Sequence, residues 1–92
     1  MTFPDIFVIA TARTAIGSFG GALKDVPNTQ LATTAVKAAI ERSGLAPDAI
    51  GHVVMGNVIP TDTKDAYLAR VAAIDAGCPI ETPAFNVNRL CG

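Results

Sequence analysis

The chain has 92 residues, of which 50% are hydrophobic and 16% are charged, and its formal net charge is −1 at pH 7. This length fits one small domain. The charges form no basic stripe, which argues against a nucleic-acid partner, and no apolar run approaches the roughly 20 residues of a membrane span. The N-terminus leaves no room for a signal or transit peptide before the first apolar run, so we expect none.

Two features of the composition bear on location and assembly. The cysteines, Cys78 and Cys91, are too few for a disulfide scaffold and lack metal-ligand spacing, so we expect a cytoplasmic protein without a metal. Typical soluble domains carry about 25% charged residues, so the apolar excess here predicts contact with further polypeptide or with a partner subunit. An ordinary alanine-rich core is the alternative.

The first half of the chain predicts a strand, a loop and a helix. Residues 5–11 (DIFVIAT) have the short, nearly continuous apolar pattern of a buried strand in a parallel sheet. The IGSFGG stretch that follows lacks the glycine order of a dinucleotide-binding motif, which favours a tight surface loop. Residues 29–43 carry apolar side chains at helical spacing. We expect Asn28 or Thr29 to cap this helix and Gly44 to end it.

The second half predicts a strand at 52–59 (HVVMGNVI), a helix at 66–76 and a strand at 84–90 (AFNVNRL). Strands that alternate with helices in this order predict an α/β fold, a βαβαβ unit with a mostly parallel sheet and right-handed crossovers. Because a parallel sheet is covered on both faces, a further helix is expected after Cys91. We therefore expect residues 1–92 to form one incomplete domain.

Cys91 is the candidate nucleophile, because it follows the last predicted strand directly. In open α/β sheets, reacting groups gather at the carboxyl ends of strands, and a thiolate is stabilised where a helix begins. A backbone N–H at such a turn can also stabilise an oxyanion, and Gly92 lets a substrate approach the backbone closely. From this local pattern alone, an inert buried cysteine is equally consistent.

Other polar residues are interpreted as structural. His52, the only histidine, begins the second strand, at the opposite end of a parallel sheet from Cys91, which disfavours a role as its base. Cys78 follows a helix C-terminus, where a thiolate is disfavoured. Arg13 is expected to fix the loop after the first strand. The two asparagines in the later strands, Asn57 and Asn86, are expected to satisfy backbone or interface groups.

Four stretches together resemble the thiolase family: ARTAIGSFGGALKD, HVVMGNVIPTD, YLARVAAIDAGCP and NRLCG. They follow the family's order and approximate spacing between Arg13 and Gly92. In thiolases the nucleophilic cysteine lies in the motif NxxCGSG, which this sequence matches from Asn88 to Gly92. The resemblance therefore implies that Cys91 takes an acyl group from acyl-CoA. The enzyme would then pass it to acetyl-CoA, or run the reverse cleavage of a 3-ketoacyl-CoA, a reaction of fatty acid metabolism.

The resemblance also implies what surrounds this segment. Thiolases have two similar halves in five layers, and this chain matches the first part of the first half. The activating histidine and a second cysteine lie further along in the family, so we expect the chain alone to be inactive. Coenzyme A enters as part of the substrate and no separate cofactor is expected, while the parent protein is expected to be a homodimer or homotetramer. The alternatives are a non-catalytic interaction module and a ketosynthase-type condensing enzyme.

Overall fold

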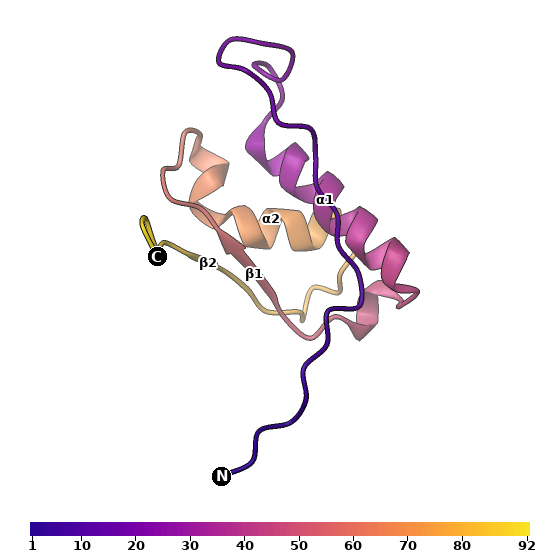
Figure 1. Ribbon diagram of the computed structural model, residues 1–92. Helices are drawn as coiled ribbons and strands as arrows, with labels where there is room; N and C mark the ends of the chain where they lie inside the picture. Colours follow the sequence, from indigo (N-terminus) through magenta and orange to yellow (C-terminus); the bar gives the residue numbers. More distant parts are fainter.

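The computed structural model describes residues 1–92 and contains two α-helices and a two-stranded parallel sheet (Figure 1). A short 3-10 turn, η1 (Pro47–Ala49), precedes the first strand, and a second one, η2 (Thr63–Tyr67), leads directly into the second helix. The main elements in chain order are α1 (Asn28–Ser43), β1 (Val53–Gly56), α2 (Leu68–Asp75) and β2 (Ala84–Val87). The α/β class and the parallel sheet are confirmed.

Helix α1 matches the helix predicted at 29–43 within one residue. Its end is the expected one: Gly44 has a φ of 75°, and its N–H donates to the Glu41 carbonyl. The expected cap at the start is wrong, because the N-cap residue is Pro27, without a side-chain hydrogen bond. The Asn28 amide donates instead to the buried carboxylate of Asp65, in η2 after β1.

Helix α2 packs against α1 on one side and against both strands on the other. Its buried residues are Leu68 and three alanines, Ala69, Ala72 and Ala73, and the buried Ala76 follows at its C-cap. The small alanine side chains let α1 and the sheet approach closely. Cys78 completes this core with Val53 and Ile40. The core therefore lies around α2.

Neither helix of the chain is long and apolar enough to cross a membrane.

The sheet has one covered face and one open face. Val53 of β1 pairs in register with Ala84 of β2, and both strands turn alternate residues toward α2. The residues of the other face remain partly exposed, among them Val54 at 50% and Phe85 at 47%. Both strands are shorter than predicted, because each ends where its ladder hydrogen bonds end.

The prediction of a first strand at 5–11 is wrong for this chain. The segment is extended but pairs with no strand, and its apolar side chains are exposed, with Ile6 at 90% and Val8 at 84%. The start of the chain projects away from the helices, and only the end of the segment reaches α1 (Figure 1), where Arg42 donates from Nη1 to the Thr11 carbonyl at 3.0 Å. An apolar pattern gives strand propensity, but a strand forms only where a neighbour accepts its backbone hydrogen bonds.

Candidate active site

Cys91 lies at the carboxyl ends of the two parallel strands, in a turn that begins three residues after β2 ends. Its side chain is exposed and forms no disulfide. The turn is closed by the Gly92 N–H, which donates to the Arg89 carbonyl at 3.1 Å, whereas the N–H of Cys91 itself donates to no group of the chain. A thiol and an unused backbone donor are thus presented together at this edge of the sheet.

The cysteine turn is tied to the neighbouring strand through Asn88. The last bond of ladder type runs from the Asn57 N–H to the Val87 carbonyl at 3.0 Å. One residue further on, the Asn88 side chain donates from Nδ2 to the Val58 carbonyl at 2.8 Å. The Asn88 side chain therefore continues the pairing of the two strand segments beyond the point where their backbones pair.

Asn86 ties β2 to the start of α2. Its Oδ1 accepts from the Ala69 N–H at 2.8 Å, and its Nδ2 donates to the carbonyls of Asp65 and Ala66, both at 3.1 Å. Asn57 reaches the same Asp65 carbonyl through its own Nδ2 at 3.0 Å. The expectation that Asn57 and Asn86 satisfy backbone groups is confirmed.

Asp65 organises the loop between β1 and α2. Its side chain is 1% exposed, and its Oδ2 accepts from the backbone N–H groups of Thr61 at 2.9 Å and Asp62 at 3.1 Å. The Thr61 hydroxyl and the Asn28 amide donate to the same oxygen. These hydrogen bonds lower the pKa of the Asp65 carboxyl below its usual value, and the largest contribution comes from the Thr61 backbone N–H. The buried Oδ1 has no partner within the chain.

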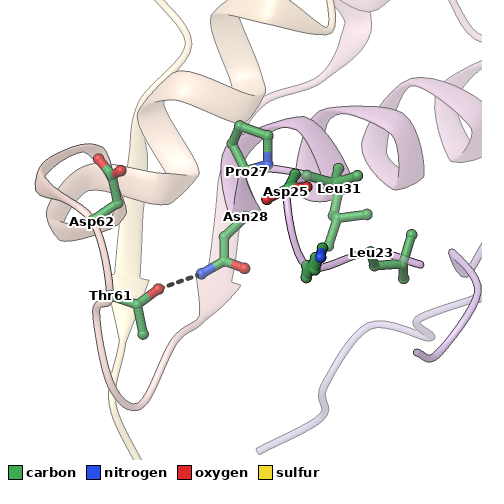
Figure 2. A pocket seen from close by; sticks show the side chains of 9 residues that line it. Leu23, Asp25, Pro27, Asn28, Leu31, Thr61 and Asp62 are labelled. Carbon is green, nitrogen blue, oxygen red and sulfur yellow. Dashed lines mark hydrogen bonds between the residues drawn. The ribbon is translucent and has the colours of Figure 1, made fainter. Parts of the chain in front are cut away.

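Figure 2 shows how this loop meets the start of α1. Asn28 points from the helix toward Thr61 and donates to its hydroxyl at 3.0 Å. Beside this contact lies an open hollow of about 360 Å³, lined on one side by residues 23–28 and on the other by Thr61 and Asp62. Neither this hollow nor any other on the chain is lined by Cys91. The residues of the chain alone therefore form no pocket around the candidate nucleophile.

The structure places the remaining candidates away from Cys91. His52 precedes β1, at the opposite end of the sheet, where its ring stacks edge-on against Phe85 with centroids 5.0 Å apart. Cys78 is buried in the core, and desolvation raises the pKa of its thiol, as expected of a structural cysteine. Arg13 is exposed, and the expectation that it fixes the loop is wrong, because Arg42 provides that contact. The IGSFGG stretch is a surface turn, as expected.

Sequence reasoning missed the structural roles of Asp65 and Arg70. Asp65 forms a capping box with Asp62, and the spacing of these two acids in TDTKD is a signal that could have revealed it. Arg70 donates to the carbonyls of Ile80 and Thr82, each at 2.9 Å, and so holds the loop that leads into β2. No local signal indicates this contact, because it joins residues ten or more positions apart.

A comparison with protein families decides which kind of protein presents this cysteine. The model of the thiolase N-terminal domain matches residues 6–92. The chain belongs to the thiolase family. The match includes the unpaired segment at 6–11, the loop around Asp65 and the turn of Cys91, so all parts of the site described above lie within the thiolase domain.

The similarity of the chain to individual thiolases supports the family match. The chain is 50% identical over 88 residues to beta-ketothiolase BktB of Cupriavidus necator and 44% identical over 87 residues to the mitochondrial 3-ketoacyl-CoA thiolase of Homo sapiens. The crystal structure of the human enzyme in complex with CoA matches with a TM-score of 0.89 over 94% of this chain. The chain spans about 22% of the length of these relatives. The thiolase fold expected from the sequence is confirmed.

Proposed function

We propose that the polypeptide containing this segment is an acyl-CoA C-acyltransferase that forms or cleaves 3-ketoacyl-CoA through an acyl group carried on Cys91. The observation that carries the proposal is the placement of Cys91. It is an exposed thiol, in a turn at the carboxyl ends of two parallel strands, within a thiolase domain. The printed names of the relatives, beta-ketothiolase and acetyl-CoA acetyltransferase, support this activity.

The chemistry uses two transfers of one acyl group. The Cys91 thiolate adds to the thioester carbonyl of acyl-CoA, and the bond from that carbon to the CoA sulfur breaks, so that CoA leaves and takes up a proton. Acetyl-CoA then loses a proton from its α-carbon, which attacks the acyl group and releases the Cys91 thiolate. A thioester on the enzyme keeps the carbonyl activated between the steps. The free N–H of Cys91 is suited to stabilise the oxyanion of each addition.

The chain by itself lacks a base for these steps, and we expect it to be inactive alone. A base acts within hydrogen-bond reach of the proton it takes, and the only histidine, His52, lies at the other end of the sheet from Cys91. The proposal therefore assigns the activating groups and the CoA pocket to further polypeptide. It needs no cofactor besides the CoA of the substrates.

Assembly and location belong to the same proposal. The free edge of β2 and the open sheet face with Val54 and Phe85 support a homodimer or homotetramer, because such surfaces are normally covered. Two free thiols, Cys78 and Cys91, suit a reducing compartment, and we assign the protein to the cytoplasm and to fatty acid metabolism. The human relative, by its name, is mitochondrial.

The two alternatives differ in their support. The family match is to thiolases, so a ketosynthase-type enzyme is not retained. A non-catalytic module that binds a partner would use the open sheet face, which is the one observation in its favour. This module needs no acyl group on Cys91, and the two proposals are therefore separable by chemistry.

The test is acetylation of the full-length polypeptide by acetyl-CoA, followed by intact mass spectrometry and peptide mapping. We expect one acetyl group on Cys91. It should be absent in Cys91→Ala and retained in the matched control Cys78→Ala, since Cys78 is buried. Acetylation that persists in Cys91→Ala, or a wild-type protein that is never acetylated, would contradict the proposed activity.

A further inference from the structure

The five residues that end the chain have a single hydrogen bond to the rest of the molecule. Residues 88–92 contribute two hydrogen bonds in all, and one of them, from Gly92 to Arg89, closes the turn within itself. The other joins the Asn88 side chain to the Val58 carbonyl at 2.8 Å. Among residues 1–92, this is the one hydrogen bond that joins the cysteine turn to the neighbouring strand segment.

The acceptor of this bond is held in place from both sides. On one side of Val58, Asn57 is fixed by its side chain to the Asp65 carbonyl and by its N–H to the Val87 carbonyl. On the other side, the N–H of Thr61 is bound by the Asp65 carboxylate. The Val58 carbonyl therefore lies in a short segment anchored at both ends.

The strand that precedes Asn88, β2, is fixed by a separate set of contacts. Asn86, in β2 and two residues before Asn88, binds three backbone groups of η2 and α2. Donor and acceptor are thus both supported, and the distance between them is a property of the fold rather than of a mobile loop. Two residues, Arg89 and Leu90, separate Asn88 from Cys91.

We propose that Asn88 is the positioning residue for Cys91: its amide N–H, bound to the Val58 carbonyl, sets the place of the thiol relative to the sheet. This inference rests on the proposed function. It names a residue that touches no reacting atom and acts only through the turn it holds. A displacement of about 1 Å at a reacting group can cost roughly a hundredfold in rate, so the loss of this one contact should be visible in the chemistry.

The chemistry of the contact requires an amide at this position. Aspartate has the same shape but offers an acceptor where Val58 already presents one, so the two oxygens repel each other. Alanine removes the contact without adding a repulsion. If Asn88 positions the turn, Asn88→Asp should therefore be impaired at least as strongly as Asn88→Ala.

The experiment compares these variants in the full-length polypeptide with the matched control Thr34→Ala. Thr34 also donates one hydrogen bond of 2.8 Å to a carbonyl, that of Gln30, but on the exposed side of α1. We expect kcat for acyl transfer to fall by about tenfold to a hundredfold in both Asn88 variants, with the KM for acetyl-CoA nearly unchanged. Thr34→Ala should keep both constants.

A second readout does not require acyl transfer. The rate at which iodoacetamide alkylates Cys91, followed by peptide mapping, should fall by about tenfold in the Asn88 variants, because a displaced thiol loses the surroundings that activate it in the full-length polypeptide. It should stay at the wild-type value in Thr34→Ala. A wild-type kcat and alkylation rate in both Asn88 variants would overturn the inference. The inference would also be overturned if the Asn88 variants lowered the thermal midpoint while kcat and the alkylation rate of the folded protein stayed at their wild-type values. An unacetylated wild type would refute the proposed function, while the alkylation rates would still decide on Asn88.

Discussion

Two apolar segments of similar character have opposite fates in this molecule. Residues 6–9 (IFVI) and residues 53–55 (VVM) both read as buried strand. In the structure, Val53 is 7% exposed and paired with β2, whereas Phe7 is 77% exposed and paired with nothing. The difference lies in what each segment meets. Strand β1 has a strand on one edge and α2 on one face, while the N-terminal segment lies beside α1 and the loop after it, without a strand partner.

Burial in a parallel sheet is therefore a property of pairs of segments and not of one segment alone. The thiolase match starts at residue 6, so the N-terminal segment belongs to the domain even though it has no strand neighbour among these residues. Its exposed side chains should contribute little to the stability of the 92-residue chain. The block from α1 to β2 should contribute nearly all of it.

The largest expected effect comes from the truncation of a buried side chain in one region, compared with the truncation of an exposed side chain in the other. Leu68 is 6% exposed and packs with Ala32 and Ala72, so Leu68→Ala should lower the free energy of unfolding by about 3 kcal/mol. Phe7→Ala removes a larger side chain from an exposed place and should change it by less than about 0.5 kcal/mol. Urea unfolding of the 92-residue chain measures both, and equal losses would show that the N-terminal segment is packed in solution.

Overpacking gives the next largest contrast. Ala73 is fully buried between Ile40, Val53 and its alanine neighbours, so Ala73→Leu should cost about 2 kcal/mol, because the helix and sheet must move apart. Ala15→Leu adds the same atoms in the exposed N-terminal region and should leave the urea midpoint unchanged. A tolerated leucine at position 73 would mean that the alanine face of α2 is not closely packed.

The pH dependence of stability separates the two regions in a third way. The pKa of Asp65 is lowered by its hydrogen bonds, so its contribution is complete above the unfolded-state value of about 3.9 and is lost as pH falls through the lower folded-state value. As the pH falls from about 5 through this lowered pKa, the urea midpoint of Asp65→Asn should therefore fall less than that of the wild type. Equal falls in the two proteins would show that Asp65 does not contribute to the acid sensitivity of the fold.

The smallest effect is expected at the contact between the two regions. Arg42→Ala removes the hydrogen bond to the Thr11 carbonyl and should lower the free energy of unfolding by less than about 1 kcal/mol. Limited proteolysis is the sharper measurement, because residues 1–11 should be cut faster in the variant while the block from α1 to β2 stays intact. Unchanged cleavage rates would show that Arg42 does not hold the segment.

The sequence allowed prediction of those features that depend on local pattern. Helix α1 and its end at Gly44 follow from apolar spacing and from a glycine where a left-handed residue is needed. The order of elements and the parallel sheet follow from alternating strands and helices. The position of Cys91 after β2 also follows, while its role as nucleophile stays a prediction.

The features that failed depend on partners distant in sequence. The strand at 5–11 required a neighbour that local pattern cannot supply, and the Asn28 cap was lost to a carboxylate 37 positions away. The bond from Asn88 to Val58 spans 30 positions and leaves no periodic trace. Side chains that bind backbone groups across such distances are invisible until the fold brings them together.

The hydrogen bond from the Ala69 N–H to Asn86 has a consequence for how the molecule folds. A helix of eight residues is too short to nucleate well alone, and here one of its first donors is satisfied by a strand 17 positions later. Helix α2 and strand β2 should therefore form in one cooperative step. Asn86→Ala, which removes the acceptor of this bond, should therefore slow refolding, as expected of a residue in the folding nucleus.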